Sequence, residues 1–155
     1  MSYIEDLTSF NYFGVNGPRL LAVGWLDADH EYSKGCVTKE FFDSLGRLAQ
    51  NAWQPFAVAG RHSCRFCVFT GGPQSIFAGG ASVSIGSGNL FVPTPDLVYV
   101  APLLILHYID AHSYYPPEEF QQATARCPEM RSMAYLKAIR THGLHKLRGD
   151  GNTEI

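Results

Sequence analysis

NLFVPTPDLVYVAPLLILHYIDAH, residues 89–112, contains a predicted hairpin followed directly by a predicted buried helix. Two short apolar runs flank Pro-Thr-Pro-Asp, a pattern typical of a β-hairpin. Pro102 then opens the apolar segment 102–112, and proline suits the first position of a helix. Because this helix is apolar on nearly every face, we expect it to lie deep in the core.

The segments on either side of this stretch alternate between a strand and helices. Upstream, residues 19–26 are apolar throughout and predict a buried strand. Residues 38–53 carry apolar side chains at helical spacing, with Thr38 as the predicted N-cap. Downstream, we expect one helix from Pro117 to about Cys127 and a last one from Pro128 to Gly143.

A histidine and two cysteines lie close together in GRHSCRFCVFTGG, residues 60–72. Cys64 and Cys67 have the C-x2-C spacing of a zinc knuckle, in which two thiolates on one tight turn reach one ion at about 2.3 Å each. His107 and His112 supply an H-x4-H pair downstream. On an ideal helix, residues five apart point about 140° away from each other. The pair therefore predicts that the helix loosens near His112.

His62 is an alternative ligand, because His62, Cys64, Cys67 and either His107 or His112 also make four. Two other interpretations stay open: buried thiols beside satisfied histidines, or a dithiol redox pair whose thiol pKa is lowered by Arg65 and His62. Val-Phe-Thr-Gly-Gly follows the pair, whereas a helix usually activates a redox cysteine. For the other two cysteines, Cys36 and Cys127, we expect a structural role and no part in the cluster.

Together these elements predict an α+β fold: one small domain over residues 1–155 with a zinc knuckle, a β-hairpin and three C-terminal helices. Residues 55–60 predict a short strand, and the glycine-rich residues 75–88 predict strand and loop. Residues 148–155 predict a flexible tail.

Several quoted motifs resemble a family of uncharacterised bacterial proteins of similar size. They are VGWLD, the G-x-H-x-C-x-x-C cluster at 60–67, NLFVP, YVAPLLILHYIDAHSYYPPEEF and CPEMRSMAY, which together span most of residues 20–135. The resemblance implies a bacterial, cytoplasmic protein and carries no known activity. It also implies that one site contains His62, Cys64, Cys67, His107 and His112.

Composition and missing motifs narrow the function classes. The net charge of −2 gives no general attraction to nucleic acid or anionic membranes. The longest apolar run, residues 97–109, is too short to span a bilayer, and the acidic start MSYIEDLTSF does not resemble a signal peptide. The sequence lacks H-E-x-x-H, G-x-S-x-G, the zinc-deaminase pattern and a phosphate-binding loop.

We therefore expect a zinc-binding, non-catalytic interaction or scaffold domain in the cytoplasm, with a protein as its partner. One alternative is a zinc-dependent hydrolase with an open position on the metal, in which Asp110 is the candidate base and Asp29 with His30 a weaker one. Another alternative is a nucleic-acid-binding module, in which the basic residues of segment 121–149 contact phosphates. The simpler interpretation of these basic residues is a helix face that is exposed to solvent.

Overall fold

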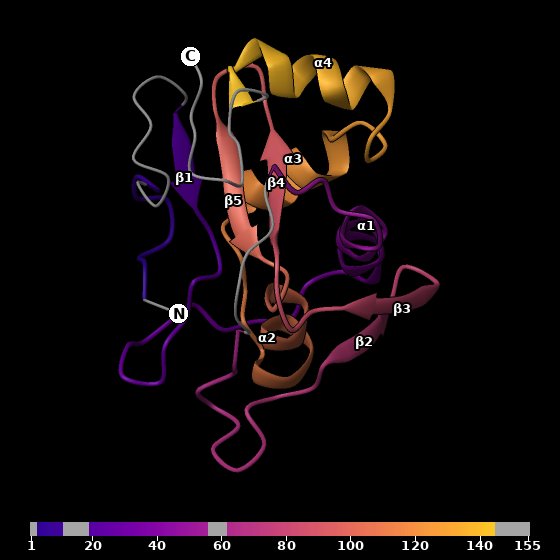
Figure 1. Cartoon of the computed structure of the whole chain (residues 1–155). Coiled ribbons are helices and arrows are strands. Elements are labelled where there is room, and N and C mark those ends of the chain that lie inside the picture. The colour runs from indigo at the N-terminus through magenta and orange to yellow at the C-terminus, as the bar shows by residue number, and fades with distance from the viewer. Residues whose placement is uncertain (1–2, 11–18, 56–61, 145–155) are drawn as a thin grey trace.

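The computed structural model describes residues 3–10, 19–55 and 62–144, which form an α+β domain. Its centre is a three-stranded sheet in the order β1-β5-β4, formed by β1 (Leu20–Ala22), β4 (Asn89–Pro93) and β5 (Val98–Pro102) (Figure 1). β1 runs parallel to β5, and β4 runs antiparallel to it. None of the described helices is long and apolar enough to cross a membrane.

The predicted β4–β5 hairpin is confirmed, with Asn89 opposite Pro102 and Pro93 opposite Val98. At its turn, the backbone N–H of Thr94 donates to the Leu97 carbonyl oxygen over 2.8 Å, and the N–H of Leu97 donates to Thr94 Oγ1 over 3.0 Å. Every residue of both strands is buried. A strand covered on both faces is expected to be apolar throughout, as these two are.

Alternate residues of β5 enter two different cores, because successive side chains of a strand point to opposite faces. Val98 and Val100 pack in one cluster with Tyr135 and Ile139 of α4 (Met133–Thr141). The intervening Tyr99 and Ala101 belong to the larger cluster. That cluster also includes buried residues of α1 (Lys39–Ala49), α2 (Ile105–His112) and α3 (Glu118–Arg126).

The predicted ends of the helices are partly right. Thr38 caps α1, since its side chain accepts a hydrogen bond from the Phe41 N–H, and α3 ends at Arg126 with Cys127 as its C-cap. The prediction that Pro102 opens a helix is wrong. Pro102 is the last residue of β5, and α2 begins at Ile105.

The last helix also begins later than predicted, at Met133 instead of Pro128. Ser132 is a better N-cap than Cys127, because its hydroxyl accepts a hydrogen bond from the Tyr135 N–H. Arg131, just before it, has a φ of 64°, which is not compatible with a helix that starts earlier.

The glycine-rich segment forms a second hairpin, where the sequence predicted strand and loop. β2 (Ser75–Ala78) pairs antiparallel with β3 (Ala81–Ser84), and the turn consists of Gly79 and Gly80. Both glycines have positive φ, 64° and 88°, as the favoured two-residue hairpin turn requires. The predicted strand at 55–60 and the predicted tail at 148–155 fall outside the described residues, apart from Pro55.

Helix α1 and the β2–β3 turn touch backbone to backbone. A Cβ atom added to Gly46 would lie 2.6 Å from both the carbonyl carbon and the Cβ of Ala78. The Gln50 side chain reinforces the contact, since its Nε2 donates to the carbonyl oxygens of Ala78 and Gly79 over 3.1 Å and 2.9 Å. The contact therefore requires a residue without a side chain at position 46.

We expect Gly46→Ala to lower the free energy of unfolding, although alanine is the better helix former. The gain in helix propensity is at most about 1 kcal/mol, whereas overpacking a tight contact costs about 1–3 kcal/mol. Denaturant unfolding measures the difference. Arg47→Ala is the control, because Arg47 is exposed on the same helix, and we expect it to change stability by less than about 0.5 kcal/mol. A Gly46→Ala protein as stable as the wild type would contradict this close approach.

Candidate metal centre

Both candidate histidines are in α2, which follows directly from the buried strand β5. His107 is almost fully buried, at 5% exposed, and His112 is half-buried at the last residue of the helix. Beyond His112 the chain turns left-handed at Ser113, with a φ of 54°, and the N–H groups of Ser113 and Tyr114 both donate to the Tyr108 carbonyl oxygen. The expected loosening therefore comes directly after His112, and the helix includes both histidines.

The cysteines lie in a compact loop that its own backbone closes. The Cys64 N–H donates to the Gly71 carbonyl oxygen over 2.6 Å, and the Gly71 N–H donates to the Cys67 carbonyl oxygen over 2.8 Å. The N–H groups of Phe66 and Cys67 also bond to the Cys64 sulfur and favour its thiolate. Amide groups directed at a sulfur in this way suit a thiolate that binds a cation.

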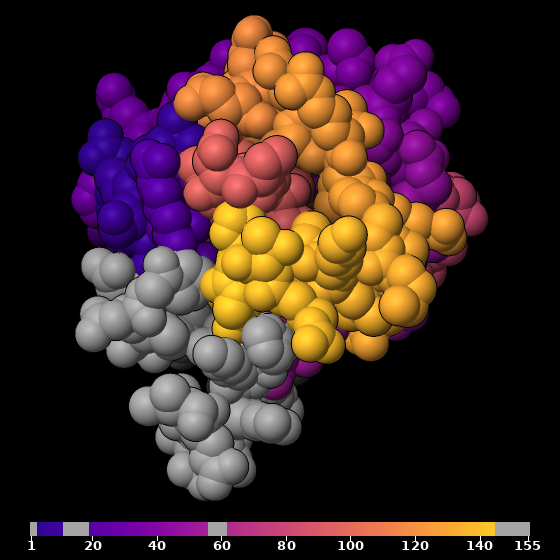
Figure 2. All heavy atoms as spheres, turned by 90° about the horizontal axis from the view of Figure 1, so that it is seen from above, coloured from indigo at the N-terminus to yellow at the C-terminus, as the bar shows by residue number. Residues whose placement is uncertain are grey.

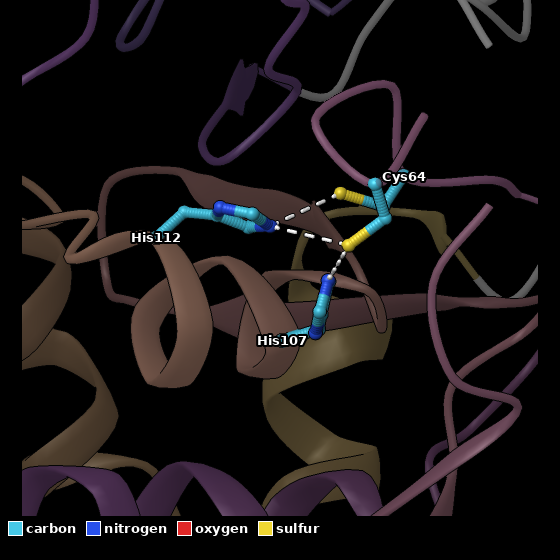
Figure 3. A group of neighbouring side chains, drawn as sticks. Cys64, His107 and His112 are labelled. Carbon is cyan, nitrogen blue, oxygen red and sulfur yellow. Dashed lines mark hydrogen bonds between the residues drawn. The ribbon is translucent and has the colours of Figure 1, made fainter. Parts of the chain in front are cut away.

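The four side chains converge across about forty residues of sequence (Figure 3). The sulfur of Cys64 lies 3.4 Å from Nε2 of His112, and the sulfur of Cys67 lies 3.3 Å from Nε2 of His107 and 3.6 Å from that of His112. All four ligand atoms lie within 4.8 Å of one another. Standard zinc–sulfur and zinc–nitrogen lengths at the tetrahedral angle predict a sulfur–nitrogen separation of about 3.6 Å. The cluster is therefore already close to the size of a tetrahedral metal site.

Without a cation, burial shifts the pKa values of His107, His112 and Cys64. Desolvation lowers the pKa of His107, with the neighbouring charge of His112 as a smaller cause, and desolvation also lowers the pKa of His112. Both imidazoles are thus held in the neutral form that binds metals. Desolvation raises the pKa of the Cys64 thiol, against the two backbone N–H bonds that lower it. A bound cation would stabilise the thiolate in that buried position.

Phe66, between the two cysteines, joins the loop to α2 and to the core. Its ring centroid lies 5.0 Å from that of His112, 5.9 Å from that of Tyr108 and 5.3 Å from that of Tyr32. The Tyr32 hydroxyl in turn donates to the His112 carbonyl oxygen over 2.8 Å. These contacts hold the imidazole of His112 and its backbone from two sides.

The other residues predicted for the site lie outside this cluster. His62 packs edge-on against Trp25, with ring centroids 6.0 Å apart. Among the described residues, no carboxylate joins the two cysteines and two histidines, and the candidate base Asp110 is exposed. His30 stacks on Tyr3 at 3.8 Å.

Cys36 and Cys127 also lie apart from the cluster. Cys36 is exposed. Cys127 packs at the edge of both core clusters, and burial raises its pKa to about 12. For Cys127 this is the opposite of the low pKa that marks a reactive cysteine.

The basic C-terminal segment is not uniformly available to a phosphate backbone. Arg131 donates through Nε to the Asn51 carbonyl oxygen over 2.9 Å and through Nη2 to the Ala52 carbonyl oxygen over 3.1 Å. These bonds tie the start of α4 to the end of α1. Arg131 therefore has a structural role that a sequence count of basic residues does not reveal.

Gly72 is the site residue that sequence reasoning did not single out. A Cβ atom there would lie 2.9 Å from Cβ of Cys64 and 3.5 Å from Nε2 of His107, and its φ is 90°. The Gly-Gly pair after the knuckle indicated a turn. It did not indicate that the second glycine lies against two of the four candidate ligands.

The chain belongs to a domain family of unknown function. Residues 2–125 match the model of the family described as Domain of unknown function (DUF7919). The expected membership of an uncharacterised family is thus confirmed, whereas the bacterial origin stays a prediction. No curated protein and no solved structure matches the chain.

We expect Gly72→Ala to weaken metal binding more than Gly71→Ala. Both glycines have positive φ, 90° and 72°, so an alanine is strained at either position. The added Cβ would meet Cys64 at 2.9 Å in the first case, but would meet Ser63 only at 3.5 Å in the second. We expect at least about a tenfold loss of affinity for Zn²⁺ from displacing the ligand, measured by competition with a chromophoric chelator. Equal affinities in the two variants would contradict the role of Gly72.

Proposed function

We propose that the protein is a zinc-binding domain in which Cys64, Cys67, His107 and His112 hold one structural ion. The observation that carries this proposal is the set of sulfur–nitrogen separations of 3.3–3.6 Å across a pair of cysteines and a pair of histidines. Two sulfur and two nitrogen donors in a tetrahedral arrangement are typical of zinc. A biological role as a non-catalytic interaction or scaffold domain fits such a site.

The alternatives for the cluster account for less of this geometry. A redox dithiol needs no imidazoles, yet each cysteine sulfur lies within 3.4 Å of a histidine nitrogen. Ordinary core packing does not require two segments about forty residues apart in the sequence to direct four donors at one point. A metal ion accounts for all four side chains at once, which supports the proposal.

Four protein donors fill the tetrahedral coordination shell of zinc and leave no position for water. A site of this kind is therefore expected to be structural.

The ion would also connect the knuckle loop to α2, two segments about forty residues apart in the sequence. Binding free energy at such a site is in large part folding free energy, on the order of 10 kcal/mol in small zinc peptides. This domain has a separate hydrophobic core, so we expect a smaller dependence on the metal.

A zinc-dependent hydrolase is the second candidate, and one feature favours it. His112 is half-buried, whereas His107 is almost fully buried, so a water molecule would most easily replace His112 on the ion. Asp110 would have to reach that water from an exposed position. We prefer the structural role because all four donors are already within reach of one centre. The proposed compartment is the cytoplasm, where reduced thiols persist.

Protein purified without added metal is expected to contain close to one zinc per chain. Elemental analysis gives the stoichiometry, and replacement with Co²⁺ gives a visible spectrum that reports thiolate and imidazole ligands in a tetrahedral site. Much less than one metal ion per chain, together with thiols that react freely, would contradict the proposal.

Removing any one donor is expected to cause loss of zinc and a large drop in Tm. The variants are Cys64→Ala, Cys67→Ala, His107→Ala and His112→Ala. Each leaves an incomplete ligand set and unlinks the knuckle from α2. Calorimetry and metal analysis of the same samples measure the two effects.

The matched controls are His62→Ala and Cys36→Ala, which remove a histidine and a cysteine outside the cluster. Both should retain one zinc per chain. Loss of zinc in His62→Ala with retention in His112→Ala would assign the fourth ligand to His62. A His112→Ala protein that keeps its zinc, stays folded and loses a measurable hydrolytic turnover would instead establish the catalytic alternative.

A further inference from the structure

The sulfurs of Cys64 and Cys67 lie close together on one short loop, residues 64–71, which we refer to as the knuckle loop. Both belong to the four ligand atoms that lie within 4.8 Å of one another. The backbone turns between the two residues, since the Cys67 N–H donates to the Cys64 carbonyl oxygen over 3.3 Å. Disulfide oxidoreductases form and break a bond between two cysteines at the same C-x2-C spacing. The two thiolates that would hold the metal are therefore also placed to form a disulfide.

The two cysteines differ in their access to solvent. Cys64 is 2% exposed, whereas Cys67 is partly exposed. Val68 and Phe69, which follow Cys67 directly, are 81% and 100% exposed, so the chain reaches the surface at this point. Oxidation of a thiolate depends on its exposure. An oxidant from solvent should therefore meet Cys67 first, and a small oxidant reaches a half-covered sulfur more easily than a large one.

We propose that a hydroperoxide, of which hydrogen peroxide is the simplest, oxidises Cys64 and Cys67 to a disulfide, and that this reaction releases the zinc ion and separates the knuckle loop from α2. The inference rests on the proposed function, because it describes the regulation of the same site. The thiolate is the form of cysteine that binds a metal. A disulfide therefore removes two of the four ligands at once, and the two histidines alone are not expected to retain the ion.

The oxidation has two steps. In the first, the Cys67 thiolate attacks one oxygen of hydrogen peroxide, the O–O bond breaks and hydroxide leaves, so that Cys67 becomes a sulfenic acid. In the second, the Cys64 thiolate attacks the Cys67 sulfur, the S–O bond breaks and a second hydroxide leaves. Two protons from solvent convert the two hydroxides to water. The pair of sulfurs loses two electrons, and the peroxide gains them.

The neighbouring Cys64 makes the oxidation reversible. A sulfenic acid that persists is oxidised further to sulfinic and sulfonic acids, which thiols do not reduce. Because the Cys64 sulfur lies within 4.8 Å of the Cys67 sulfur, it captures the sulfenic acid as a disulfide before that happens. The exposed Cys36 is not part of this cluster and provides an internal comparison.

The knuckle loop is expected to keep its closed form after the ion leaves. The Cys64 N–H donates to the Gly71 carbonyl oxygen, and the Gly71 N–H donates to the Cys67 carbonyl oxygen. Neither bond involves a sulfur. What the disulfide removes is the connection from the two sulfurs to Nε2 of His107 and of His112. The expected change is therefore a separation of the loop from the helix.

The effect of oxidation is expected to stay at one end of the molecule. The knuckle loop and α2 lie at the opposite end from α4 (Figure 1). Figure 2 shows the face formed by α4, α3 and the β4–β5 turn. Tyr135 and Ile139 of α4 pack in a core cluster that includes no described residue of the loop. That end of the domain should remain folded without the metal, so that reduction can restore the site.

Treatment of the zinc-loaded wild-type protein with hydrogen peroxide, in the presence of a chromophoric chelator, tests the inference. We expect release of close to one zinc per chain and a disulfide between Cys64 and Cys67. Trypsin cleaves after Arg65, between the two cysteines, so the disulfide should link two tryptic peptides that reduction separates. Tm should fall toward that of the His107→Ala protein. Dithiothreitol followed by Zn²⁺ should restore the zinc content and Tm.

The order of the two steps and the role of the exposed thiol are tested separately. Dimedone, which reacts with sulfenic acids, should label Cys67 and not Cys64 when it is present during the oxidation. An adduct on Cys64 would contradict the assigned order. The matched control is Cys36→Ala, which should release its zinc at the same rate as the wild type, because Cys36 lies outside the cluster.

A protein that keeps its zinc while peroxide oxidises Cys36 would overturn the inference, as would zinc release without a disulfide between Cys64 and Cys67. Metal content is measured before the oxidant is added, which separates this failure from that of the proposed function. A protein with one zinc that peroxide does not release refutes the inference alone. A protein that contains no zinc at the start refutes the proposed function, whatever peroxide then does to its thiols.

Discussion

The burial of β5 on both faces is the constraint on which the rest of the structure depends. Val98 and Val100 pack toward α4, and Tyr99 and Ala101 pack toward the larger core. The chain passes from β5 into α2 after only two residues. Residues Ile105–Ile109 of α2 are buried as well, so the position of His107 follows from the packing of the strand and of the first turns of the helix.

The candidate metal centre lies where this rigid unit meets a segment that hydrophobic packing cannot hold alone. The knuckle directs Cys64, Phe66 and Cys67 inward, while Val68 and Phe69 remain exposed. Ordering each backbone residue costs about 1–2 kcal/mol, and these three side chains recover only part of that for the whole loop. A metal ion bound by the two cysteines of the loop and the two histidines of α2 would supply the difference. This explains in physical terms why a small loop in a protein with a substantial core would need a metal.

Local patterns in the sequence predicted the parts of this arrangement that depend on neighbouring residues. The β4–β5 hairpin, the Thr38 cap and the end of α3 follow from turn and capping chemistry. The spacings C-x2-C and H-x4-H grouped the four residues that the structure brings together, although the sequence could not exclude His62 as a ligand in place of either His107 or His112. That choice depends on where Trp25 lies, because Trp25 is the partner that His62 contacts.

The errors arose where tertiary contacts outweigh a local preference. Pro102 favours the start of a helix, but pairing opposite Asn89 extends β5 through it. In the sequence, Gly46 is only a residue of low helix propensity inside a predicted helix, and nothing beside it indicates a contact. In the structure, the β2–β3 turn can approach α1 only because position 46 lacks a side chain. Gly72 has the same role beside Cys64. Both glycines are required because a segment distant in the sequence approaches their backbone closely. The residues next to each glycine in the sequence carry no information about that distant segment, so the local pattern could not predict the contact.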